Sequence, residues 1–398
     1  MGEIVLAVAF LNGCDQPQDL LAGSVAHQSA GFPLARSEVE KLKAYSAPLE
    51  GRRALLRLDF NENTIGPSPL VVDALRGFAL EEIAVYPEYA GLQQAVVTNL
   101  LLTGCHRDLK PQQVGLFNGV DAAIHALFHA YGATGDRLLT TDPTFGYYSP
   151  CARMQGMVIE AIPYQQETFD FPIAAIQSAL LQHQPRILLI CNPNNPTGTR
   201  LAPEKILELA LAAPQTLVVV DELYEAFTGD SVLPTAQFNA MPNLLVLRSL
   251  SKTAGLAGLR IGFAIGHEQV VDRISRVTGP YDINSLAVTA AFAALKDQVY
   301  VDAYVQEVLR ARDWITARLQ AQGVHLHCAG GNYLLIWPSQ HPADVESKLR
   351  EEGILVRSMT GKTLIDGALR VSIGTTSQMQ RFAEAFERIE NLNLGMAT

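Results

Sequence analysis

From about Arg36 onward, apolar runs of strand length alternate with amphipathic segments of helical spacing. Three runs are apolar on both faces, as strands covered by helices must be. They read RILLIC (Arg186 to Cys191), TLVVVD (Thr216 to Asp221) and NLLVLRSLSK (Asn243 to Lys252). No repeat, low-complexity tract or Gly/Ser linker interrupts the alternation. The pattern predicts an α/β fold with a mostly parallel sheet and helices on both faces.

Each of these three runs ends abruptly in polar residues. The first continues into NPNNPTG, the second into DELY and the third into SLSK. In open α/β sheets, ligands bind beyond the carboxyl ends of the strands. We therefore expect the three polar tails to converge on one site.

A fourth run adds an anion site to this picture. VGLF (Val114 to Phe117) is a short strand, and NGVDAAIHALFHAYG (Asn118 to Gly132) follows with apolar residues at helical spacing. Unpaired backbone N–H groups and the helix dipole make such a helix start attractive to anions. Neither GxGxxG after a strand nor GxxxxGK[ST] occurs, so a monophosphate is expected rather than a nucleotide. A glycine turn that binds nothing is the alternative.

The C-terminal part predicts a second, smaller α+β unit. Its HLHCAG, NYLLIWP and ALRVSIG read as strands and QRFAEAFERIENL as a closing helix. A chain of 398 residues that is 48% hydrophobic has room for two cores. We predict a large domain at 69–286 and a small domain at 287–398, with 36–68 packing on the small domain or on a partner subunit. Residues 1–35 are expected to be a loosely structured extension, in which IVLAVAFL lacks the basic flank of a signal peptide. The stretch SEVEKLKAY, which follows from Ser37, shows helical spacing.

Charge and cysteine usage narrow the possible partners. Lysine and arginine number 30 against 40 acidic residues, without a long run of either sign, which disfavours nucleic acid and anionic membranes. Five cysteines without CxxC spacing favour a reducing cytoplasm over a disulfide framework or a zinc site. No apolar stretch approaches the roughly 20 residues of a membrane-spanning helix. His325, His327 and Cys328 alternate along a predicted strand, so no metal site is expected there.

Lys252 is the residue on which the chemistry depends. A lysine at a strand end can form an imine with a carbonyl, and desolvation or neighbouring cations would make it nucleophilic. Together with a phosphate site and the carboxylate of Asp221, it predicts pyridoxal phosphate, whose ring nitrogen needs an acidic partner. The alternatives are an exposed lysine at a helix start and an aspartate that caps the next helix.

Eight motifs in this order resemble the fold-type I pyridoxal-phosphate aminotransferases, and most closely the histidinol-phosphate aminotransferases. The resemblance covers about Arg36 to Leu392, and the order and spacing of the motifs make it specific. It implies a seven-stranded, mostly parallel sheet with helices on both faces and a smaller α+β domain. The motifs are LDFNENTIGPSP, YPEY, NGVDAAI, DPTFGYY, NPNNPTG, DELYEAF, SLSKTAGLAGLRIG and LRVSIGT.

The resemblance implies a role for each cofactor-binding residue. Lys252 would bind the cofactor aldehyde and then carry the substrate proton, while Asp221 would hold the protonated ring nitrogen. Asn195 and Tyr224 would bind the phenolic oxygen, and Phe145 would stack on the ring. The phosphate would be bound by Gly119, Val120, Asp121, Ser249, Ser251 and Arg260, joined by Tyr86 from the neighbouring subunit of a homodimer. Asn195 could otherwise be a turn residue, and Tyr224 and Phe145 packing aromatics.

Substrate recognition also follows from the resemblance. Tyr45, Arg357 and Arg370 match positions that bind the substrate's anionic groups, together with Asn195, and a guanidinium suits a carboxylate or a phosphate. The implied reaction exchanges an amino group between histidinol phosphate and 2-oxoglutarate. Aromatic amino-acid transamination and a threonine-phosphate-type decarboxylation remain alternatives. A DNA-binding sensor is disfavoured because only about 35 residues precede the match.

Some positions depart from the family pattern. Val120 takes a position that is usually small, Ala122 replaces a glutamate, and Leu223 stands where alanine is usual. Backbone donors are unaffected by such changes. We therefore expect them to bear on the substrate and not on the cofactor chemistry.

Overall fold

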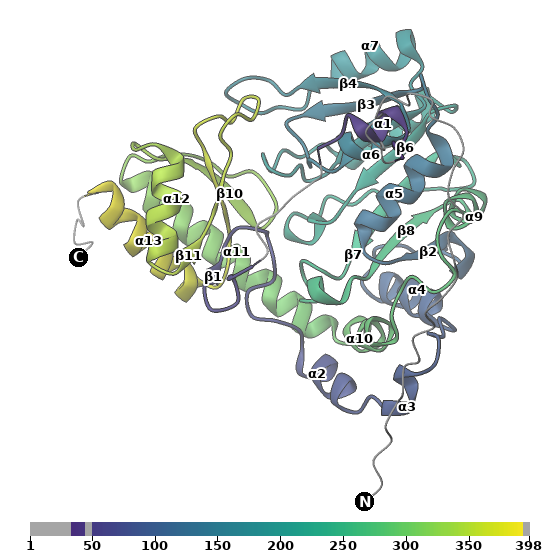
Figure 1. Cartoon of the computed structure of the whole chain (residues 1–398), viewed down its shortest axis with the longest axis horizontal. Helices are drawn as coiled ribbons and strands as arrows, with labels where there is room; N and C mark the ends of the chain where they lie inside the picture. The colour runs from purple at the N-terminus through teal and green to yellow at the C-terminus, as the bar shows by residue number, and fades with distance from the viewer. Residues whose placement is uncertain (1–32, 44–49, 393–398) are drawn as a thin grey trace, which may run out of the picture.

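The computed structural model describes residues 33–43 and 50–392 (Figure 1). Of the predicted N-terminal extension, residues 1–32 lie outside the described residues. Within the described parts of the chain, no helix has the length and apolar character needed to cross a bilayer.

A seven-stranded sheet forms the larger part of the molecule. Its strand order is β2-β8-β7-β6-β5-β3-β4, and only β8 runs antiparallel to its neighbours. The strands are β2 (Val114–Phe117), β3 (Arg137–Asp142), β4 (Val158–Pro163), β5 (Ile187–Cys191), β6 (Leu217–Asp221), β7 (Leu244–Ser249) and β8 (Gly262–Gly266). The predicted mostly parallel sheet is confirmed, and VGLF forms β2 with the predicted bounds.

Helices cover both faces of this sheet because its central strands are apolar on both sides. In β5, Leu188 and Ile190 pack into one core while Ile187 and Leu189 pack into the other. The first core includes residues of α2 (Pro69–Arg76), α4 (Leu92–Leu102), α7 (Ile173–His183), α8 (Pro203–Ala212) and α10 (Ser285–Lys296). The second includes residues of α5 (Val120–Tyr131), α6 (Tyr148–Met154) and α9 (Glu268–Ser275). Alternation along a fully buried strand therefore builds two cores from one sheet.

A four-stranded antiparallel sheet with order β12-β13-β10-β9 forms the second part. Its strands are β9 (His325–His327), β10 (Tyr333–Trp337), β12 (Arg357–Ser358) and β13 (Leu369–Ser372). Packed on it are α11 (Gln298–Ala321), α12 (Pro342–Glu351) and α13 (Thr376–Glu390), seen on the left of Figure 1. The three strands and the closing helix predicted from sequence are all present.

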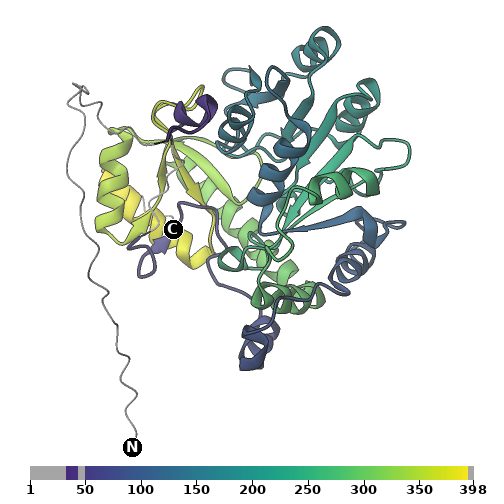
Figure 2. The ribbon, with the colours of Figure 1, turned by 45° about the vertical axis from the view of Figure 1, so that its right-hand side comes forward.

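The segment before the large sheet joins this second part. β1 (Leu56–Arg57) pairs in parallel with β11 (Ile354–Leu355), and the backbone N–H of Ser372 donates to the carbonyl of Leu58. Figure 2 shows this segment beside the four-stranded sheet. The helical pattern SEVEKLKAY yields only the short α1 (Ser37–Glu40) within the described residues, and the short α3 (Leu80–Ile83) follows α2. The domain boundaries themselves stay a prediction.

Candidate active site

The carboxyl ends of β5, β6 and β7 meet at one edge of the large sheet. Cys191 is the register partner of Asp221, and Asp221 is that of Leu247. The polar tails that follow these three strands therefore start side by side, as the sequence pattern predicts.

Lys252 lies in the tail that follows β7, three residues after the strand ends. Its ammonium Nζ donates to the backbone carbonyl of Phe60 over 2.9 Å and lies 5.9 Å from the centre of the Tyr224 ring. Burial, reinforced by the positive charge of Arg370, lowers the pKa of Lys252 from its usual 10.5 to about 8. The amine is therefore far closer to its nucleophilic, neutral form at neutral pH than a surface lysine would be.

Asp221 ends β6 in a fully enclosed position. Burial raises the pKa of its carboxyl to about 6, while a hydrogen bond from the Tyr148 hydroxyl, 2.5 Å from Oδ2, opposes the rise. Tyr148 is completely buried and stems from the start of α6. Tyr148 was not among the predicted site residues, although it lies within the DPTFGYY motif. An aspartate held in this way can bind a cationic ring N–H and is not needed as a helix cap.

Gly119 and Arg260 lie against one another at the predicted phosphate site. Gly119 precedes α5 with a φ of +78°, and a Cβ there would lie 2.5 Å from Nη2 of Arg260. Arg260 also donates to the Asp121 carboxylate over 2.8 Å. The positive φ favours glycine at this position, and its lack of a side chain lets the guanidinium lie against the helix start, so backbone N–H groups and a cation face the same space.

Two serines of the lysine segment lie beside this helix start. The Ser249 hydroxyl donates to that of Ser251 over 2.9 Å, and Ser249 pairs in the sheet with Gly262. A Cβ at Gly262 would lie 2.6 Å from the backbone nitrogen of Val120. β8 thus brings the serines and the start of α5 into contact distance.

Tyr224 is buried, and its hydroxyl accepts two amide hydrogen bonds. Asn195 Nδ2 lies 3.3 Å and Asn61 Nδ2 lies 3.2 Å from the hydroxyl oxygen. Asn195 was among the predicted site residues, whereas Asn61, which lies in the LDFNENTIGPSP motif, was not. Desolvation raises the pKa of Tyr224 above its usual range, so the phenol is protonated at neutral pH.

Residues 58–63 cross the site next to Lys252. Arg52 holds this stretch with two hydrogen bonds to the buried Asp59, at 2.8 and 2.6 Å. Arg370 donates to the Asp59 carbonyl over 2.5 Å and to Asn195 Oδ1 over 2.8 Å. The predicted substrate-binding Arg370 therefore belongs to the same cluster as the predicted cofactor residues.

The remaining predicted residues lie at different distances from this cluster. Phe145 meets Tyr148 edge to face, with ring centres 5.4 Å apart. The Arg357 guanidinium lies 5.6 Å from the centre of the Phe60 ring. Tyr86 is 71% exposed and stacks on Tyr281, so a single chain does not bring it into the cluster. Tyr45 lies outside the described residues.

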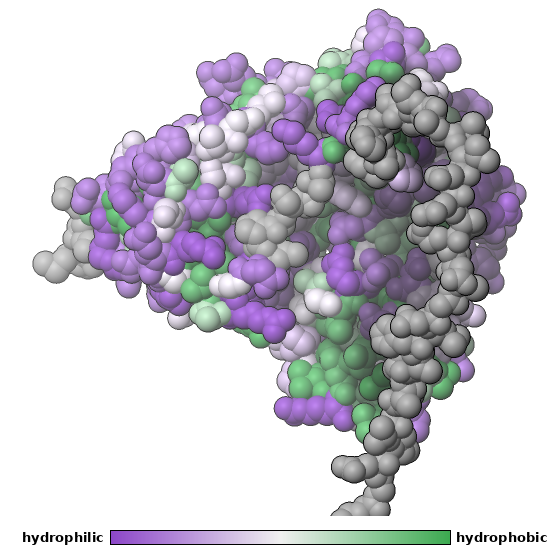
Figure 3. Space-filling model, in the orientation of Figure 1, coloured by the Kyte–Doolittle hydropathy of each residue, from purple (hydrophilic) through white to green (hydrophobic). Residues whose placement is uncertain are grey.

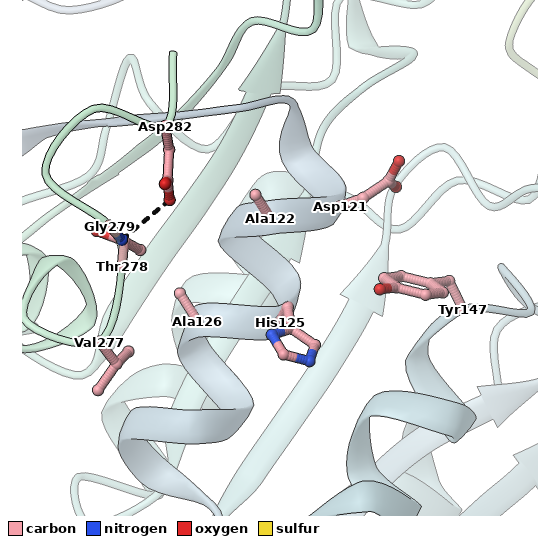
Figure 4. Close-up of a pocket in the computed structure, with 9 residues that line it drawn as sticks. All are labelled: Asp121, Ala122, His125, Ala126, Tyr147, Val277, Thr278, Gly279 and Asp282. Atoms are coloured by element: carbon pink, nitrogen blue, oxygen red, sulfur yellow. Dashed lines mark hydrogen bonds between the residues drawn. The ribbon is translucent and has the colours of Figure 1, made fainter. Parts of the chain in front are cut away.

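A cavity of about 390 Å³ adjoins the start of α5. Figure 4 shows Asp121 and His125 on one wall of this cavity and Tyr147 opposite them. On the far side, the backbone N–H of Gly279 donates a hydrogen bond to the Asp282 carboxylate. Because Asp121 also binds Arg260, the cavity borders the predicted phosphate site. Among the described residues, no group of histidine, cysteine and acidic side chains could hold a metal ion.

The donor set fits pyridoxal phosphate. A helix start and a guanidinium with no room for a Cβ suit the phosphate, and a lysine of lowered pKa suits the aldehyde. A buried carboxylate suits the ring nitrogen, and a buried phenol suits the phenolic oxygen. The matching groups follow the ends of three strands: the helix start follows β2, Asp221 and Tyr224 lie at the end of β6, and Lys252 follows β7.

Comparison with known proteins agrees with this chemistry. Residues 53–386 match the family model described as aminotransferase class I and II. A histidinol-phosphate aminotransferase of Pseudomonas aeruginosa is 33% identical over 83% of this chain and 92% of its own length. One from Pseudomonas fluorescens is 32% identical over 82% of this chain and 90% of its own. The histidinol-phosphate aminotransferase of Sinorhizobium meliloti, solved with pyridoxal phosphate, superposes with a TM-score of 0.80 at 22% identity, over 91% of this chain and 99% of its own.

Proposed function

The chain belongs to the class I and II aminotransferases, and from this premise we propose that it exchanges an amino group between histidinol phosphate and 2-oxoglutarate. The predicted fold type, the aminotransferase activity and the pyridoxal-phosphate cofactor are confirmed at the level of the family. The identity of the substrate and the roles of individual residues are our proposal.

The observation that carries the substrate proposal is a pair of arginines. Arg357 on β12 and Arg370 on β13 are register partners in an antiparallel pair. Side chains directly opposite one another in such a pair share a face of the sheet, and like charges there repel. A dianionic phosphate relieves this repulsion better than a single carboxylate. Arg370 connects the pair to the reaction centre through Asn195.

The cofactor supplies an aldehyde that binds the substrate amine and a ring that accepts the electron pair of the broken C–H bond. With the cofactor bound, Lys252 Nζ would be the group that takes up the substrate proton and gives it back, a role that requires the neutral amine. Because the pKa of Lys252 is lowered to about 8, a far larger share of this amine is neutral near neutral pH than of a lysine in water. Asp221 holds the proton on the ring nitrogen through its carboxylate, and Tyr148 fixes that carboxylate by its hydroxyl.

The same residues orient the bound groups. Gly119, Val120, Asp121, Ser249, Ser251 and Arg260 bind the phosphate, Phe145 covers the ring, and Asn195 and Tyr224 face the phenolic oxygen. We assign 69–286 to a cofactor domain and 287–398 to a small domain whose closure brings Arg357 onto the substrate and excludes water. Tyr45, outside the described residues, is proposed as a further phosphate ligand.

We also propose a homodimer with shared active sites. Large apolar side chains are exposed on and after α3: Leu80 is 80%, Ile83 66% and Val85 62% exposed, next to Tyr86 at 71%. Figure 3 shows a hydrophobic area on the side of the molecule where Figure 1 places α2 and α3. Burying such an area against a second copy is favourable, and it would allow Tyr86 to reach the partner's phosphate site.

A cytoplasmic location completes the proposal. The four cysteines in the described parts of the chain are unpaired, as in a reducing compartment. The expected partners are an amino donor and a 2-oxo acid, and neither nucleic acid nor membrane is required.

The test of the proposed function is a substrate panel on the purified chain loaded with pyridoxal phosphate. Histidinol phosphate with 2-oxoglutarate should yield glutamate at a higher kcat/KM than phenylalanine or tyrosine. Arg357→Gln should raise KM for histidinol phosphate by about tenfold or more and leave KM for phenylalanine nearly unchanged. Preference for an aromatic amino acid would support the first alternative. Release of carbon dioxide from threonine phosphate without glutamate would overturn the transaminase.

A further inference from the structure

Asn61 is a buried residue whose side chain reaches the reaction centre from a distant part of the chain. It is 1% exposed, has a φ of +54° and donates from Nδ2 to the Tyr224 hydroxyl over 3.2 Å. Its backbone N–H donates to the Ser372 hydroxyl over 2.9 Å, and its backbone carbonyl accepts from Asn332 over 3.2 Å. An asparagine held at both backbone groups has a fixed side-chain position.

The orientation of the Asn61 amide follows from Ser372. The Ser372 hydroxyl oxygen accepts from the backbone N–H of Asn61, and the acceptor for its own hydrogen is Asn61 Oδ1, 2.8 Å away. The oxygen of this amide therefore faces Ser372, and the NH₂ group must face Tyr224. Ser372 is completely buried, so water does not compete for this bond.

The orientation of the Asn195 amide is fixed independently by Arg370. A guanidinium only donates, so the side-chain atom of Asn195 that lies 2.8 Å from Arg370 is its oxygen. The NH₂ group of Asn195 then faces the Tyr224 hydroxyl, 3.3 Å away.

A tyrosine hydroxyl can accept hydrogen bonds at its oxygen and donate one through its hydrogen. In Tyr224 both amide contacts are N–H donors, so neither can receive the hydroxyl hydrogen. We propose that Asn61 is a positioning residue that, together with Asn195, keeps the Tyr224 hydroxyl directed as a donor to the phenolic oxygen of the cofactor. The inference deepens the proposed function and rests on it only for the identity of the cofactor.

The decisive variant is Asn61→Asp in the full-length chain. A carboxylate keeps the oxygen that Ser372 needs but replaces the N–H donor by an acceptor, which attracts the Tyr224 hydrogen away from the cofactor. Loss of a hydrogen bond to the anionic phenolic oxygen raises the proton affinity of the bound cofactor. The cofactor's apparent pKa, followed by its absorbance, should therefore rise by about one. Affinity for pyridoxal phosphate, followed by titration, should fall on the order of tenfold.

A double-mutant cycle with Tyr224→Phe separates positioning from a general structural effect. In the Tyr224→Phe background, Asn61→Asp should change the cofactor pKa by less than about 0.3 and the affinity by less than about twofold, because the hydroxyl it redirects is absent. Asn63→Asp is the matched control, since it adds the same charge to the same stretch while its side chain reaches the Thr253 carbonyl instead of Tyr224. It should leave the cofactor pKa close to that of the wild type.

Ser372→Ala is the second variant and serves if Asn61→Asp does not fold. This variant lacks the hydroxyl that orients the Asn61 amide. It should raise the cofactor pKa by less than Asn61→Asp does, and again only when Tyr224 is present. An equal effect with and without Tyr224, or an unchanged spectrum in both variants, would overturn the inference. A chain that shows the predicted pattern but does not convert histidinol phosphate would support the inference and refute the substrate proposal.

Discussion

Lys252→Met should stabilise the cofactor-free protein at neutral pH, although Lys252 is the proposed reactive residue. Methionine has a similar length and no charge to desolvate. Burial lowers the pKa of Lys252 from 10.5 to about 8, which corresponds to roughly 3 kcal/mol of unfavourable charging in the folded state. The Lys252 side chain is not fully enclosed, so we expect a gain in unfolding free energy of about 2–3 kcal/mol.

The gain should depend on pH in a defined direction. Below pH 8 the lysine is charged in both states, and the folded state carries the full penalty. Between pH 8 and 10.5 the unfolded chain binds the proton and the folded chain does not, so wild-type stability rises with pH. The difference between Lys252→Met and the wild type should therefore shrink by about 1.4 kcal/mol for each pH unit above 8.

Thermal unfolding of both cofactor-free proteins at pH 7 and 9.5 measures this difference. For 398 residues, an unfolding entropy of about 2.1 cal/mol/K per residue converts 2–3 kcal/mol into a midpoint rise of roughly 2–4 °C at pH 7. Lys205→Met, whose side chain is 51% exposed on α8, controls for the loss of one positive charge. Two results would refute the desolvation of Lys252. One is a Lys252→Met protein that is less stable than the wild type at pH 7, and the other is a difference in unfolding midpoint between the two proteins that is the same at both pH values.

Three further predictions concern other parts of the site. Tyr148→Phe removes the hydrogen bond that stabilises the Asp221 carboxylate, so the acid limb of the pH–rate profile should move up by about one pH unit, and an unmoved limb would contradict this role. Gly119→Ala places a Cβ 2.5 Å from a guanidinium nitrogen, at a backbone φ of +78°. Pyridoxal phosphate should therefore bind to this variant at least about tenfold more weakly, as measured by fluorescence titration. Unchanged binding would show that the helix start does not hold the phosphate. Mixing equal amounts of inactive Tyr86→Ala and Lys252→Ala chains should restore about a quarter of wild-type turnover, because about half of the dimers are hybrids and each hybrid has one intact site. No recovery would mean that Tyr86 does not act across the dimer.

The sequence predicted the elements of the large sheet well because their signal is local. The runs that form β5, β6 and β7 are apolar at every position, and each ends at a polar residue that the structure places at the same edge of the sheet. The pattern failed for SEVEKLKAY, where helical spacing extends well beyond the four residues of α1. None of the α1 residues is buried, and a helix without tertiary packing is short.

Two neighbours of the predicted residues were missed for a different reason. Asn61 and Tyr224 are 163 positions apart, and Tyr148 and Asp221 are 73 apart, so no periodicity links them. Both missed residues lie inside motifs that the sequence had already marked. Their motifs indicated importance but not partners.

The sequence by itself determined the order of strands and helices, the polar ends of the central strands, and the set of residue types that pyridoxal phosphate requires. These properties depend on the alternation of apolar positions and on residue chemistry, both of which can be read along the chain. Only the tertiary structure decided that Lys252 is desolvated next to Phe60, that Asp221 is held by Tyr148, and which way the amides around Tyr224 point. Those features are set by distances between segments far apart in the chain, and a hydrogen bond or a pKa depends on those distances.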